Sequence, residues 1–138
     1  MAHPHPGARR SGPGLSPHHW LVDGTNVVGA TPDGWWKDRP GAFARLVGEL
    51  ATLGEPVDVV FDGRPAFERG GDVTVHWARV ADDRIVTLAE ETADRDALLA
   101  VTSDRGLATR LRALGVEVVG VNHLRRRLRE TTAAAEGD

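Results

Sequence analysis

Three short apolar segments of this chain each end at an aspartate, and this repeated pattern constrains the fold more than any other feature. The segments cover residues 20–22, 57–61 and 98–103, and the acids that follow them are Asp23, Asp62 and Asp104. A buried strand that ends in this way places a carboxylate at the edge of a sheet, where α/β proteins bind their ligands. If the three strands are parallel neighbours, the three carboxylates meet at that edge.

Segments with helical spacing of apolar residues separate these strands. Asp38 as N-cap with Pro40 in the first turn predicts a helix that stops at Gly54, and further helices are expected over about 82–91 and 105–114. Strands are also expected at 73–78, where alternation indicates an edge and a solvated His76, and at 116–121. A last short helix follows, with Asn122 as its cap. This order predicts an α/β fold, a three-layer sandwich around a mainly parallel five-stranded sheet.

Length and composition indicate one domain. The chain has 138 residues, of which 41% are hydrophobic and 27% charged, as in ordinary globular domains. We expect a folded domain over 18–130, with disordered tails at 1–17, rich in Pro, Gly, Ser and His, and at 131–138. No apolar run approaches the roughly 20 residues of a membrane span, and no secretory h-region is present. The absence of cysteine fits a cytoplasmic protein.

A net charge of −3 argues against a protein that coats nucleic acid through bulk positive charge, but it leaves room for local basic groups. Arg64, Arg69 and Arg105 flank the predicted acidic edge and are candidates for binding phosphate; ordinary solvated arginines are the alternative. The adjacent Trp35 and Trp36 either stack on bases or pack over the core.

Two more acids, Asp82 and Asp83, open a predicted helix at the same edge. Crowded carboxylates repel one another and raise each other's pKa values unless a cation neutralises them. A cluster of oxygen ligands without cysteine favours Mg²⁺ or Mn²⁺, and such an ion suits phosphoryl chemistry. Each aspartate taken alone could instead be a turn or cap residue, but capping does not explain why three strands end in the same acid.

Four segments resemble, in order, the acidic motifs of the NYN domain, a branch of the PIN-like nucleases, and the YacP-type bacterial ribonucleases are the most similar. These are residues 21–29 (LVDGTNVVG), 59–63 (VVFDG), 81–85 (ADDRI) and 101–107 (VTSDRGL). The resemblance spans roughly residues 20–128 and implies a PIN-like, Rossmann-like fold and a Mg²⁺- or Mn²⁺-dependent ribonuclease acting on single-stranded RNA. The metal-holding acids that it implies are Asp23, Asp62, Asp82 and Asp104, with Asn26 as a polar companion and Asp83 as a substitute or outer-shell acid.

Other functions remain open. A non-catalytic module that binds RNA or the ribosome could keep this fold, although an acidic pocket does not help to bind a polyanion. A toxin-type PIN nuclease would share the same chemistry. An aspartyl-nucleophile phosphatase would have an acid at the position of Thr25, and a dinucleotide-binding enzyme would have a G-x-G-x-x-G motif after the first strand; neither is present.

Overall fold

Six strands form one sheet in the order β3-β4-β2-β1-β5-β6 in the computed structural model, which describes residues 19–65, 69–70 and 72–137. The predicted tail at 1–17 lies outside the described residues. The strands are β1 His19–Asp23, β2 Val57–Asp62, β3 Arg69–Gly70, β4 Val73–Ala78, β5 Leu98–Val101 and β6 Glu117–Val119. The helices are α2 Gly24–Gly29, α3 Arg39–Ala51, α4 Ala81–Glu91, α5 Arg105–Ala113 and α6 Val121–Gly137, with 3₁₀ turns η1 Trp35–Lys37 and η2 Arg95–Ala97.

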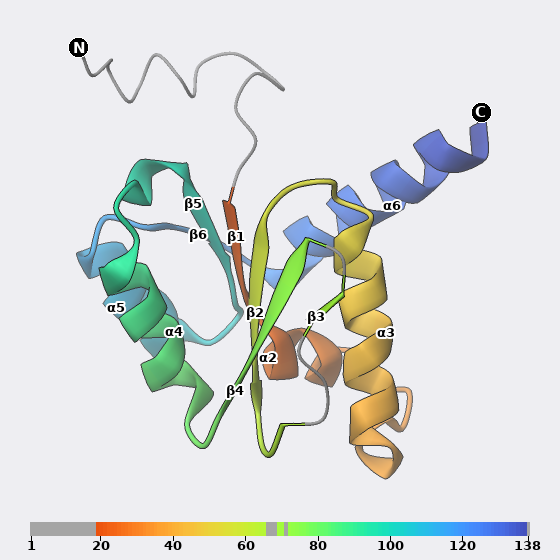
Figure 1. Ribbon diagram of the computed structural model, residues 1–138, viewed down its shortest axis with the longest axis horizontal. Helices are drawn as coiled ribbons and strands as arrows, with labels where there is room; N and C mark the ends of the chain where they lie inside the picture. The colour runs from red at the N-terminus through yellow and green to blue at the C-terminus, as the bar shows by residue number, and fades with distance from the viewer. Residues whose placement is uncertain (1–18, 66–68, 71, 138) are drawn as a thin grey trace.

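The five longer strands are all parallel, which confirms the predicted fold class. The two-residue strand β3 pairs antiparallel with β4 at the edge and was not expected from the sequence. Because the five parallel strands run in the same direction, their carboxyl ends lie together. Figure 1 shows this edge at the bottom of the view, where β1 passes directly into α2.

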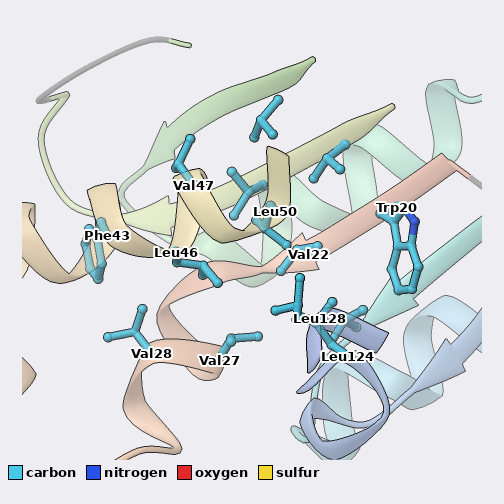
Figure 2. Close-up of a cluster of buried hydrophobic side chains, with 14 of the residues drawn as sticks. Trp20, Val22, Val27, Val28, Phe43, Leu46, Val47, Leu50, Leu124 and Leu128 are labelled. Carbon is cyan, nitrogen blue, oxygen red and sulfur yellow. The ribbon is translucent and has the colours of Figure 1, made fainter. Parts of the chain in front are cut away.

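One face of the sheet is covered by α2, α3 and α6. Phe43, Leu46 and Leu50 of α3 are almost fully buried, as the predicted helical spacing required. Figure 2 shows these side chains in one cluster with Val27 of α2 and Leu124 of α6, where Val22 of β1 lies near the centre and Trp20 lies at the opposite end from Phe43. The ring of Phe43 stacks on that of Phe61 with a centroid distance of 4.2 Å, and this contact fixes α3 above the end of β2.

The opposite face is covered by α4 and α5. Ile85 and Ala89 of α4 and Leu107 and Leu111 of α5 are buried against a second apolar cluster that includes Leu21, Val60 and Ala100 of the sheet. The two helical layers on opposite faces give the predicted three-layer sandwich (Figure 1). Since α4 follows β4 and α5 follows β5, the N-termini of both helices lie at the carboxyl edge of the sheet.

The segment after β1 differs from the sequence prediction. Residues 23–26 were expected to form a turn, but Gly24 starts the short helix α2 directly. A Cβ atom on Gly24 would lie 2.5 Å from Phe61 Cε1 and 2.8 Å from Val59 Cγ2. This glycine is therefore needed for the close approach of α2 to β2, which places the residues after Asp23 against the end of β2.

The C-terminal helix also differs. α6 continues to Gly137, through the segment that was expected to be a tail from residue 131. Leu124 and Leu128 are buried and anchor the helix on the core. Residues 133–135 are all alanine, which has the highest helix propensity and favours the continuation of α6. Across the described ranges of the chain, no helix has the length and apolar character needed to cross a membrane.

His76 is not simply solvated, as the strand pattern suggested. Its Nε2 lies 2.7 Å from Asp58 Oδ1, and His19 Nε2 lies 2.6 Å from Asp58 Oδ2, so one carboxylate joins β1, β2 and β4. Burial alone would raise the pKa of Asp58, but the hydrogen bonds and charge of the two histidines outweigh it and hold that pKa well below its usual range.

Candidate active site

An open pocket of about 390 Å³ lies at the carboxyl edge of the sheet. Its walls come from the end of β1, from α2, from the end of β2, from the first turn of α4 and from the loop between β5 and α5. The predicted site residues that line it are Asp23, Asn26, Asp62, Asp82 and Asp104. Segments far apart in the sequence thus bring four carboxylates and one amide into a single pocket, which we call the acidic pocket.

Asp23 lies at the base of the acidic pocket and is the most deeply buried of its acids, with 5% of its surface exposed. Its Oδ2 accepts a hydrogen bond of 2.8 Å from the hydroxyl of Thr102. Burial raises the pKa of Asp23 to about 6, and the nearby charges of Asp82 and Asp62 add to this, while the bonds from Thr102 and the Asn26 backbone oppose it. The ionised form of Asp23 is therefore destabilised in the folded protein.

Asp62 connects the end of β2 to two other elements. Its backbone N–H donates to Thr25 Oγ1 at 2.9 Å, and its Oδ1 accepts from the backbone N–H of Ala81 at 2.9 Å. The second bond satisfies one of the unpaired donors in the first turn of α4. One oxygen of the Asp62 carboxylate thus positions α4, and the side chain lies in the wall of the acidic pocket.

Asp82 and Asp83 are neighbours in α4 with different environments. Burial, together with the charges of Asp104 and Asp62, raises the pKa of Asp82, although Arg110 opposes this. The Asp83 side chain is 68% exposed and bonds Arg110 Nη1 at 3.0 Å. Asp83 does not line the acidic pocket, so the structure does not bring this predicted metal ligand together with the other acids.

Asp104 and Asn26 both fix the loop between β5 and α5, which lines the acidic pocket. Asp104 is the N-cap of α5, and its Oδ1 accepts from the backbone N–H of Leu107 at 2.9 Å. Asn26 Oδ1 accepts from the backbone N–H of Ser103 at 2.9 Å and so ties α2 to this loop. Asn26 therefore acts as a positioning residue, because its carbonyl oxygen is engaged by the protein itself.

The donor set of the acidic pocket fits a hard divalent cation by its chemistry, since four carboxylates supply oxygen ligands and no sulfur. Asp82 has no hydrogen-bond or ion-pair partner among the described residues. In the positions that the side chains take, however, no three described His, Asp or Glu residues close into a metal-binding arrangement. The four carboxylates thus line one pocket, and their charges raise the pKa values of Asp23 and Asp82, but they do not form a complete coordination sphere.

The predicted phosphate-binding arginines lie in different places. Arg105 is exposed at the start of α5 and lines a neighbouring pocket together with Asp104. Arg64 is exposed in the loop after β2 and does not line the acidic pocket. Arg69 contributes backbone to β3, and its side chain lies outside the described part of the structure.

The two tryptophans have different environments. Trp35 packs against the first core cluster, 6.4 Å from the ring of Phe43, which confirms core packing for this residue. Trp36 is 59% exposed, and stacking on a base stays a prediction for it.

Sequence reasoning missed three residues that shape the site. The hydroxyl oxygen of Thr102 accepts a hydrogen bond from the backbone N–H of Asp104 at 3.1 Å, and its hydroxyl proton is donated to Asp23. Thr25 holds the end of β2, as described above. Arg39 lies with its guanidinium 5.2 Å from the ring of Trp35 and donates to the Asp62 carbonyl at 3.4 Å. The two threonines lie within the acidic motifs, but Arg39 has no signal in the sequence.

The comparisons with known proteins identify the fold. No protein-family profile matches the sequence, and no curated protein matches it either. Among solved structures, Rae1 (YacP) from Bacillus subtilis is similar, with a TM-score of 0.71 and 26% identity over 86% of this chain and 77% of that chain. A mutant form of the same protein has a TM-score of 0.74 and 24% identity over 86% of this chain and 79% of that chain. The predicted resemblance is thus confirmed at the level of the fold: the chain has a YacP-like NYN fold.

Proposed function

We propose that this protein is a Mg²⁺- or Mn²⁺-dependent ribonuclease that hydrolyses phosphodiester bonds of single-stranded RNA in the acidic pocket. The observation that carries the proposal is the convergence of Asp23, Asp62, Asp82 and Asp104 from four separate segments on one open pocket. Structural similarity to Rae1 (YacP) supports an RNA-related role.

The electrostatics of the acidic pocket support a role for a cation. Asp23 and Asp82 both have raised pKa values, and neighbouring carboxylates contribute to both. A protein gains no stability from such crowding. Asp62 and Asp104 also bind helix N-termini, but that role does not explain why Asp23 and Asp82 lie beside them, whereas a positively charged ligand does. Asp23, Asp62, Asp82 and Asp104 would hold this ion, which would supply Lewis-acid stabilisation of the charge that develops on the phosphoryl group.

The protein's own groups then have distinct tasks. Thr102 orients the buried carboxylate of Asp23, and Thr25 and Asn26 fix the two loops that carry Asp62 and Asp104. Hydrolysis joins a water oxygen to phosphorus and breaks one phosphorus–oxygen ester bond, and the departing oxygen takes a proton. Because the pocket is open to solvent, water has direct access to a phosphate bound among the aspartates.

The test is cleavage of end-labelled single-stranded RNA by the purified full chain with Mn²⁺, with Mg²⁺ and with EDTA. Wild type should cleave with either metal and stop in EDTA. Asp104→Asn should lose cleavage while α5 stays folded, because asparagine is as good an N-cap as aspartate. Asp33→Asn changes the same charge on an exposed loop and should cleave like wild type.

Two outcomes would reject the proposal. If wild type binds the RNA but does not cleave it with either metal, the protein is a non-catalytic RNA-binding module. If Asp104→Asn cleaves as fast as Asp33→Asn, the acidic pocket is not the site of hydrolysis.

A further inference from the structure

A second pocket of about 440 Å³ opens beside the acidic pocket, between α5 and the turn that joins β6 to α6. We call it the α5 pocket. It shares Ser103 and Asp104 with the acidic pocket, so the two pockets adjoin at the loop between β5 and α5. A polymer strand with one phosphodiester among the aspartates would therefore have its next unit in or near the α5 pocket.

One face of α5 forms a wall of this pocket. Arg105, Ala108, Thr109 and Arg112 all line it, at the spacing of three or four residues that puts side chains on the same side of a helix. The two arginines stand about 10 Å apart along the helix axis. Val118, Val119 and Gly120 also line this pocket, and both valines are half-buried. Val118 packs with the cluster on the α5 side of the sheet and Val119 with the cluster on the other side, so only Val118 presents its side chain towards α5. The pocket thus combines a cationic wall with one apolar side chain.

The arginines of this wall have no side-chain partner among the described residues. Arg105 and Arg112 are exposed, and neither has an ion pair or side-chain hydrogen bond with any residue that the structure describes. Arg110, on the same helix, instead bonds Asp83 at 3.0 Å. These two guanidinium groups have no partner among the described residues and line the pocket next to Asp104, and forked contacts with phosphate are the chemistry to which guanidinium is best suited.

We infer that the α5 pocket is a nucleotide subsite, which binds the RNA nucleotide next to the phosphodiester in the acidic pocket. Arg105 and Arg112 contact the phosphates of this nucleotide, and its base lies against Val118. The volume is within the usual range of small-ligand pockets, roughly 300–1,000 Å³. The inference rests on the proposed function for the identity of the polymer, but binding itself requires no cleavage.

The test measures binding rather than catalysis. The full chain carrying Asp23→Asn, which prevents turnover, is titrated with fluorescently labelled single-stranded RNA at several salt concentrations, with anisotropy as the readout. Arg105→Gln with Arg112→Gln should weaken binding and lower the slope of log affinity against log salt by about 1.4, which is about 0.7 for each phosphate that an arginine no longer neutralises. The ratio of the variant's Kd to the parent's Kd should therefore fall roughly sevenfold between about 50 and 200 mM salt.

The control is Arg45→Gln with Arg129→Gln, which removes the same charge from exposed positions on α3 and α6. This variant should keep the parent slope. The nucleotide subsite is rejected if the α5 variant has the same slope as this control, or if the parent does not bind the RNA. Failure of the proposed function is separate, because a protein that binds RNA through Arg105 and Arg112 but never cleaves it supports the subsite and rejects the ribonuclease.

Discussion

Removing the buried negative charge at Asp23 should stabilise the metal-free protein at alkaline pH. The pKa of Asp23 is raised from 3.8 to about 6, and this interval corresponds to a cost of roughly 3 kcal/mol for the ionised side chain. That cost is already net of the hydrogen bond from Thr102 to the carboxylate, and Asp23→Asn removes it but brings a buried amide N–H donor, which costs about 1 kcal/mol. We therefore expect a net stabilisation of roughly 2 kcal/mol at about pH 8.

The sign of the pH dependence follows from the raised pKa. In wild type, the favourable contribution of protonated Asp23 is complete below pH 3.8 and is lost as the pH rises through about 6. The advantage of Asp23→Asn over wild type should consequently fall by roughly 2 kcal/mol between about pH 8 and pH 4. Urea unfolding in EDTA at both pH values measures it, with Asp33→Asn as the exposed control.

The reasoning would be refuted if Asp23→Asn were as neutral as Asp33→Asn at both pH values, or destabilising by the same amount at both. Either result would mean that the pKa of the Asp23 carboxyl group is not raised in the folded protein.

Three further predictions concern other parts of the molecule. Gly24→Ala should destabilise the protein by about 1–3 kcal/mol in urea unfolding, since its Cβ would clash with Phe61 and Val59; an unchanged midpoint would show that α2 can move away. Asp58→Asn should cost roughly 1–2 kcal/mol at neutral pH. That loss should be complete above pH 3.8 and fade gradually as the pH falls from 3.8 towards the lowered pKa of Asp58 in the folded protein, and a pH-independent loss would contradict a role for the ionised carboxylate. Trp36→Ala should weaken RNA binding in anisotropy titrations by about 1–3 kcal/mol if a base stacks there, and it should leave thermal unfolding unchanged; unaltered affinity would exclude the stacking.

The sheet could be predicted from the sequence because its strands are buried on both faces. Runs such as 57–61 are apolar almost throughout, and each is bounded by an acid or a glycine, so both their length and their ends are visible. The N-cap at Asp38 is equally visible, and its side chain accepts from the backbone N–H of Gly41 as expected. Topology rules for parallel strands then place Asp23, Asp62 and Asp104 at one edge.

Contacts that depend on side-chain geometry could not be predicted in this way. Asp82 and Asp83 are equivalent in the sequence, but the rotation of α4 turns one into the acidic pocket and the other towards Arg110. Gly24 reads as a turn residue, whereas its role is a close approach to Phe61 that arises only when β2 and α2 meet. The bridge between His19, Asp58 and His76 likewise requires three strands to be in register.

The difference between Asp82 and Asp83 provides the most direct test of the acidic pocket. Cleavage of labelled single-stranded RNA in Mn²⁺ and in EDTA should be compared for wild type, Asp82→Asn and Asp83→Asn. We predict that wild type and Asp83→Asn cleave in Mn²⁺ and stop in EDTA, and that Asp82→Asn does not cleave. Equal cleavage by the two variants, or cleavage by wild type that continues in EDTA, would contradict a metal-dependent reaction among the four carboxylates.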